Sequence, residues 1–232
     1  MALKGRKKSI AENDNNNIFW TTMSDLLLGL AIIFMTLFVL AMTGFTQQNV
    51  EQKKQQMEMG KELIKKLQEA NINAEVDKMT GDIKISDLDL FEVGSYTLSS
   101  RGKLFLDKFA PIYINTIFAK KDFVDNIESI IVQGHTDSQS YAGINNPDEQ
   151  YLRNMTLSLE RANSVANYIF KTNYDKKYGS QLKKILVVEG KSYSEPVLVN
   201  GQEDYNKSRR VELRLKAKSL DIIDNLFQKG KK

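Results

Sequence analysis

The chain has 232 residues, enough for one ordinary globular domain and an accessory segment, and its 33 Lys and Arg against 29 Asp and Glu give a formal net charge of +4. The excess positive charge lies mainly at the two chain ends, and no basic stripe with interleaved aromatic residues runs through the body, which argues against binding to nucleic acid. The absence of cysteine excludes disulfides, thiolate metal sites, a cysteine nucleophile and a lipid-modified N-terminus, and the single histidine, His135, excludes a multi-histidine metal site within one chain.

An apolar run, LLLGLAIIFMTLFVLAM, lies within residues 18–45. A membrane-spanning helix needs about 20 mainly apolar residues, so we predict a single transmembrane helix over this stretch. The alternative is a cleaved signal peptide, but the run is longer than a typical signal core, contains an Asp and has no small-residue cleavage site after it. Residues 1–17 carry a basic cluster and residues 46–50 carry no Lys or Arg, so we expect a cytoplasmic N-terminal tail and an external body.

Asp25 lies inside this predicted span, roughly 7–8 Å beyond Trp20 at the rise of a helix. A carboxylate at the centre of a span costs roughly 2.5–3.5 kcal/mol, and the short side chain of Asp cannot easily reach the interface. The alternative is a boundary residue, but the default interpretation is an ion carrier that faces a partner. Small and polar residues share its helix face at spacings typical of close helix contact in lipid, namely Thr22, Gly29, Thr36 and Thr43.

Residues 46–73 are polar, rich in Gln, Lys and Glu, and free of Pro, so we predict a helical linker that continues out of the membrane. An imperfect heptad pattern is interrupted by Lys53 and Gly60 and otherwise carries apolar residues, at Val50, Met57, Ile64 and Leu67. Three interpretations stay open: a weak coiled coil, a solvated spacer, or a plug helix that blocks ion flow before activation.

Beyond the linker, short strand patterns alternate with two long helical patterns. The predicted elements are a hairpin of 74–79 with 82–86, a helix over 98–118, a strand over 129–133, a helix over 152–174, and strands over 185–188 and 211–215. This order predicts an α+β protein whose C-terminal domain is an α/β sandwich with helices on one face of a mixed sheet.

Three ordered segments resemble the OmpA-like peptidoglycan-binding family: Gly134-His135-Thr136-Asp137, Asn154-x-x-Leu157-Ser158-x-x-Arg161-Ala162, and Arg209-Arg210-Val211-Glu212. Phe91, Gly94-Ser95 and Leu98 look like the opening strand and loop of that family. The resemblance covers residues 74–217 and leaves residues 218–232 as a C-terminal tail. Two features depart from the family pattern: a longer loop over 138–153, and Ser208 where the family has an Asn before the two arginines.

The resemblance implies a site for the diaminopimelate stem peptide of peptidoglycan. Asp137 would bind the ammonium of the ligand and Arg161 its carboxylate, since the planar guanidinium offers a bidentate fork to a carboxylate. By the same resemblance, Thr136, Asn154 and Leu157 shape the pocket, and Arg209 and Arg210 close it. His135 is interpreted as a core histidine, because no Cys nucleophile or second His exists to act with it.

The span with its early Asp, the helical linker and this domain together resemble the MotB family, and Phe19-Trp20-x-x-x-Ser24-Asp25-Leu26 looks like that family's segment around the ion-carrying Asp. The short chain and direct linker look most like the ZorB family of Zorya anti-phage defence systems. The resemblance implies a dimer within about five copies of a MotA-like (ZorA-like) inner-membrane subunit, a transported proton or alternatively sodium ion, a periplasmic domain, and no enzyme activity, metal or cofactor. A flagellar stator subunit and a static cell-wall anchor are the alternatives.

Overall fold

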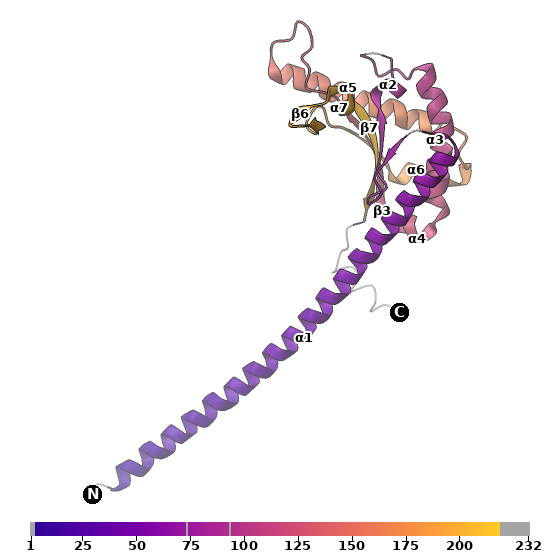
Figure 1. Cartoon of the computed structure of the whole chain (residues 1–232). Helices are drawn as coiled ribbons and strands as arrows, with labels where there is room; N and C mark the ends of the chain where they lie inside the picture. The colour runs from indigo at the N-terminus through magenta and orange to yellow at the C-terminus, as the bar shows by residue number, and fades with distance from the viewer. Residues whose placement is uncertain (1–2, 73, 93, 219–232) are drawn as a thin grey trace. The chain divides into compact units, whose positions relative to one another are not determined.

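The computed structural model of the chain describes residues 3–72, 74–92 and 94–218, and of these it describes only the backbone at 3–17 and at residue 48. The chain forms two compact units that divide between Val50 and Glu51 (Figure 1). Of the predicted tail at 218–232, all but Lys218 lies outside the described residues.

Helix α1 runs from Leu3 to Glu69 without interruption. Its part from Ile18 onward is long and apolar enough to cross a membrane, as the sequence predicts. The hydroxyl groups of Thr22, Thr36 and Thr43 donate hydrogen bonds to carbonyls in the preceding turn, as Thr36 Oγ1 does to Ile33 O at 2.8 Å. Such bonds keep a polar side chain satisfied inside a helix where no water is available.

The C-terminal unit is built on a five-stranded sheet in the order β1-β2-β7-β3-β4. The strands are β1 Glu75–Val76, β2 Ile83–Ser86, β3 Ile127–His135, β4 Leu186–Gly190 and β7 Arg210–Ala217. Only β3 and β4 pair in parallel, and the other neighbours are antiparallel. A separate hairpin is formed by β5 Leu198–Val199 and β6 Gln202–Glu203.

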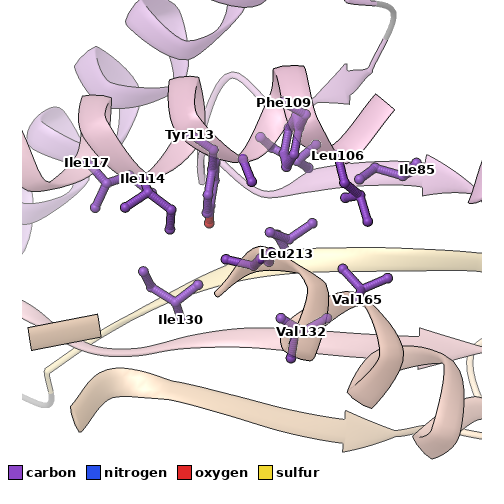
Figure 2. Packing of buried hydrophobic residues seen from close by; sticks show 14 of the residues in the cluster. Ile85, Leu106, Phe109, Tyr113, Ile114, Ile117, Ile130, Val132, Val165 and Leu213 are labelled. Carbon is purple, nitrogen blue, oxygen red and sulfur yellow. The ribbon is translucent and has the colours of Figure 1, made fainter. Parts of the chain in front are cut away.

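Two long helices, α3 Ser100–Ala119 and α5 Pro147–Ile169, supply the apolar layer above the sheet. Figure 2 shows Phe109, Tyr113 and Ile114 of α3 pointing toward Ile130 and Leu213 of the sheet, and all five side chains are fully buried. The shorter helices are α2 Asp87–Leu90, α4 Lys121–Asp125, the 3-10 turn η1 Lys176–Tyr178, α6 Gly179–Ile185 and α7 Tyr205–Ser208. The predicted α+β sandwich is therefore confirmed.

Helix α5 begins earlier than the apolar pattern predicts, and the loop before it is correspondingly shorter. The Asn146 side chain accepts hydrogen bonds from the amides of Asp148 and Glu149, and Pro147 occupies the first helical turn. Asn is a favoured N-cap, and Pro is favoured at the first helical position because no intrahelical partner is lost there. About half of the segment predicted as a long loop over 138–153 is thus helix.

The end of α1 belongs to the core of the C-terminal domain. Met59, Leu63 and Leu67 are at most 2% exposed and lie in the same cluster as the sheet and α3 side chains. Glu62 forms an ion pair with Lys120 at 2.5 Å, which fixes the helix beside the end of α3. Of the heptad positions, Leu67 lies in this cluster, whereas Val50 is 60% exposed. A contribution of this segment to the domain core was not indicated by the heptad pattern.

Candidate functional site

The ends of three neighbouring strands bring charged residues together. Ser86 of β2 pairs with Arg210 of β7, which pairs with His135 of β3, so these three positions lie side by side at one end of the sheet. The chain segments that continue past this end carry Asp87, Arg209, Thr136 and Asp137. Figure 1 shows α2, α5 and α7 at this same end of the domain.

Helix α5 positions Arg161 at this end through a close approach to β3. A Cβ built at Gly134 would lie 2.0 Å from Ser158 O, so only glycine allows the helix backbone to rest directly on the strand. Arg161 follows Ser158 by about one helical turn. The close contact therefore sets the height of the arginine above the end of the sheet.

Arg161 is 3% exposed and its guanidinium is held from three sides. Its Nη2 lies 3.1 Å from Asp87 Oδ2, and its Nε donates a hydrogen bond to Ser95 O at 3.0 Å. The guanidinium also stands over the ring of Phe91 at 5.4 Å from the centroid, a cation–π contact. The arginine predicted to bind a carboxylate is thus already bound to one.

Asp137 is likewise paired within the chain. Its Oδ2 accepts a hydrogen bond from Arg209 Nη1, and its Oδ1 accepts one from the amide of Gln139 at 3.1 Å. Arg209 Nη1 also donates to the side chain of Gln139 at 3.3 Å. The structure therefore brings together four of the residues at this end in two ion pairs, Asp87–Arg161 and Asp137–Arg209.

Burial and neighbouring charges in this cluster shift the pKa values of Asp87 and Arg161. Burial raises the pKa of the Asp87 carboxyl, against the opposing effects of the Arg161 and Arg209 cations, and the Asp137 anion raises it further. Burial lowers the pKa of Arg161, and Asp87 acts in the opposite direction. A guanidinium stays protonated in proteins even so. The cluster thus alternates in sign and carries no net charge when both carboxyls are ionised.

Of the predicted pocket-shaping residues, Thr136 adjoins Asp137, and Asn154 and Leu157 precede Arg161 on α5 by about two turns and one turn. Thr136 is 3% exposed; its amide donates to Ser192 O at 2.9 Å, while its Oγ1 is buried and makes no hydrogen bond within the described residues. Tyr141 OH donates to Asn154 Oδ1 at 3.3 Å. Leu157 is half-buried on the same helix as Asn154. Tyr141, which sequence reasoning did not single out, contributes a partly buried ring from the segment before α5.

Arg210 does not join the four-charge cluster. Arg209 directly precedes β7 in an extended conformation, and successive residues of extended backbone point to opposite sides, so Arg210 points away from Arg209. Its Nε pairs with Glu212 Oε1 at 2.6 Å, and its Nη1 donates to the carbonyls of Ser208 and Glu195 at 3.1 and 3.2 Å. Arg210 therefore fastens the segment between β4 and β7 to the face of the sheet that α3 and α5 leave open.

His135 lies beside Arg210 and is buried, in agreement with its interpretation as a core residue. Its Nε2 is 3.0 Å from Gln133 Oε1, and its Nδ1 makes no hydrogen bond within the described residues. Burial and the nearby Arg210 cation lower the pKa of His135 to about 3. The ring is therefore neutral at physiological pH.

The stripe predicted on the apolar helix lies on one face of α1. At about 100° per residue, Thr22, Asp25, Gly29, Thr36 and Thr43 fall within roughly 60° of arc. All five are exposed, and a Cβ built at Gly29 meets no atom within 4 Å. No cluster of three or more His, Asp or Glu side chains that could hold a metal ion occurs among residues 3–72, 74–92 and 94–218.

Asp87 is the cluster member that the sequence motifs did not reveal. It lies directly after a strand whose alternating Ile83 and Ile85 are buried, but its partner comes from a helix more than seventy residues later. Placing a polar residue at the end of a strand was possible from the sequence. Knowing that this strand lies two places from β3 required the sheet order.

Comparisons with known proteins agree with this architecture. Residues 90–210 match the OmpA family. The chain is 30% identical over 221 residues to the Zorya protein ZorB of Escherichia coli strain Crooks, covering 90% of this chain and 92% of that protein. It is 24% identical over 229 residues to ZorB of Escherichia coli O139:H28, covering 92% and 84%.

Among solved structures, a MotB-like protein from Desulfovibrio vulgaris is similar with a TM-score of 0.51 and 19% identity, over 74% of this chain and 96% of that one. This likeness shows a common fold. The extent and identity of the match to the curated relatives show more: the chain belongs to the ZorB family, with a C-terminal domain of the OmpA family.

Proposed function

We propose that the chain is the peptidoglycan-anchored B subunit of an ion-driven inner-membrane motor that acts in Zorya-type anti-phage defence. The observation that carries the proposal is Asp25, the single charged residue in residues 18–45 of a chain that belongs to the ZorB family. A static anchor has no use for a carboxylate that lowers the stability of its span.

Asp25 acts as the ion carrier in this proposal, with a proton as the transported ion and sodium as the alternative. The stripe around it offers small side chains and threonine hydroxyls that are satisfied within the helix, as Thr43 Oγ1 is by Val39 O at 2.8 Å. Such a face permits close packing against another helix in lipid. The partner is a MotA-like (ZorA-like) membrane subunit, with five copies around a dimer of this chain.

The C-terminal domain holds peptidoglycan on the periplasmic side, with the N-terminal tail in the cytoplasm. A diaminopimelate stem peptide ends in a centre that carries both an ammonium and a carboxylate group. Asp137 and Arg161, held in one cluster, offer charges that complement both groups, and an arginine can bind a carboxylate with two parallel hydrogen bonds. The domain thereby fixes the subunit to the wall while ions pass the span, and the chain itself catalyses no reaction.

The motor assignment is tested by phage plating on cells that carry the whole operon. Asp25→Asn should abolish protection while the protein still reaches the membrane. Ser24→Ala is the matched control, because Ser24 is the adjacent polar residue, off the stripe, and its hydroxyl donates to Trp20 O of its own helix at 2.8 Å. Protection that persists in Asp25→Asn would refute the ion-carrier role; dependence of swimming rather than protection on Asp25 would favour the flagellar alternative.

The wall assignment is tested by co-sedimentation of the detergent-solubilised full chain with purified diaminopimelate-type sacculi. Arg161→Ala and Asp137→Ala should each reduce the sedimented fraction. Arg214→Ala serves as the control, since Arg214 lies on the open face of the sheet, away from the cluster. Equal sedimentation of all four proteins would refute the proposed site.

A further inference from the structure

Both charges that the proposed wall ligand needs are occupied by groups of the chain itself. The Asp87 carboxylate lies on Arg161, where the carboxylate of the ligand would bind, and the Arg209 guanidinium lies on Asp137, where the ammonium would bind. Arg161 and Asp87 are 3% and 7% exposed, so a ligand cannot reach the guanidinium while the two side chains are paired. The site is therefore closed by internal ion pairs, which are the same kind of contact that it would make with the ligand.

The pair between Asp87 and Arg161 is incompletely satisfied. Asp87 Oδ1 is buried and makes no hydrogen bond within the described residues, and the same holds for Thr136 Oγ1 nearby. A buried acceptor without a partner is unfavourable, and a buried ion pair is favourable only when its remaining lone pairs are satisfied. In the closed pair, Asp87 Oδ1 therefore lacks a hydrogen bond that the carboxylate could form if it left Arg161 and another group took its place.

The two ion pairs are also joined through the backbone. The amide of Asp87 donates a hydrogen bond to the carbonyl of Arg209 at 3.1 Å, across the ends of β2 and β7. Asp87 begins α2, which has only four residues. A displacement of this short helix therefore acts on the residue that covers Asp137 as well as on the carboxylate that covers Arg161.

We propose that Asp87 is an internal competitor for Arg161, and that the wall ligand binds by displacing the Asp87 carboxylate. The inference rests on the proposed wall-binding function of the same site and adds its regulation: the empty site is closed, and each binding event is an exchange of partners within the four-charge cluster. The more stable the Asp87–Arg161 pair is, the more it lowers the affinity of the site for the wall. If Asp87 were only a structural counter-ion, removing it would weaken binding or leave it unchanged.

The test compares full-length wild type, Asp87→Asn and Asp87→Ala in sedimentation with diaminopimelate-type sacculi, with soluble meso-diaminopimelate as a competitor. Both variants should bind about fivefold more tightly or better, the lower end of typical coupling between two binding events. Asp89→Asn is the matched control, because Asp89 lies on the same helix but pairs with the exposed Arg101. Equal or weaker binding by a folded Asp87 variant would overturn the proposal.

Arg161→Ala separates this outcome from failure of the wall assignment. If wild type sediments and Arg161→Ala does not, the site binds the wall whatever Asp87 does; if both sediment equally, the wall assignment itself fails, and the competitor role with it. Should both Asp87 variants fail to fold, wild-type sedimentation is measured from pH 7.5 to 5.5. Burial raises the pKa of the Asp87 carboxyl against the opposing Arg161 and Arg209 cations, so Asp87 is protonated and releases Arg161 at a higher pH than an ordinary Asp. Tighter binding at lower pH supports the proposal, and unchanged or weaker binding refutes it.

Discussion

Truncating Leu63 tests whether the end of α1 is part of the domain core. The Leu63 side chain is fully buried among the side chains of the core. A buried Leu→Ala substitution removes the transfer free energy of the lost atoms and leaves a cavity, at a cost of about 2–5 kcal/mol. For a domain of this size each kcal/mol corresponds to about 2–4 °C, so Leu63→Ala should lower the melting temperature by about 4–20 °C.

Ile64→Ala is the matched control, since Ile64 is the neighbouring heptad position and is only half-buried. We expect it to cost less than about 1 kcal/mol, because the side chain lies off the packed face and its removal leaves no enclosed cavity. Thermal unfolding of the detergent-solubilised full chain, followed by the near-ultraviolet circular dichroism of buried tyrosines such as Tyr113, measures both. A larger loss for Ile64→Ala than for Leu63→Ala would refute the docked-helix reasoning and favour a coiled-coil seam.

Two further predictions concern stability around the sheet end. Burial holds the pKa of His135 at about 3 in the folded chain against 6.5 in the unfolded chain. The unfolded state therefore binds more protons below pH 6.5, and urea unfolding should show stability lower by about 2 kcal/mol at pH 5 than at pH 7.5, a difference that His135→Gln should abolish. Gly134→Ala should push α5 away from β3, costing about 1–3 kcal/mol and weakening sedimentation with sacculi. Gly179→Ala, where the nearest atom to a new Cβ lies 3.4 Å away, should be tolerated, and equal melting temperatures for the two glycine variants would contradict the close-contact argument.

The predicted order of strands and helices is confirmed because each element has a clear apolar period. Val211, Leu213 and Leu215 alternate on β7 and are all buried. The contribution of the linker to the core was missed because Met59, Leu63 and Leu67 follow a four-residue spacing that a seven-residue pattern partly obscures. A helix with apolar residues on two faces does not reveal which face meets the domain, since that choice depends on the tertiary partner.

The candidate site was predictable only in part. Asp137 and Arg161 were named by resemblance, and the structure places both in one cluster. The opposite orientations of Arg209 and Arg210 were not predicted, because the expected strand over 211–215 begins after both and the resemblance gave both arginines the same closing role. Asp87 could not be assigned, because its place beside Arg161 depends on the order of strands and on the close approach of α5 to Gly134.

The balance of charge in the cluster bears on which ligands it would accept. Two carboxylates and two guanidinium groups sum to zero, and a ligand centre that carries one ammonium and one carboxylate is also neutral. Exchange with such a ligand pairs Arg161 and Asp137 with the ligand and releases one anion, Asp87, together with one cation, Arg209. A ligand with the ammonium alone would leave the Asp87–Arg161 pair closed and gain only the contact with Asp137. An unpaired buried charge is strongly unfavourable, so a simple anion that displaced Asp87 would gain little. We therefore expect sacculi with lysine in place of diaminopimelate to sediment less of the full chain, with the difference between the two wall types smaller in Arg161→Ala than in wild type. Equal binding of both wall types by wild type would show that the ligand carboxylate does not reach Arg161.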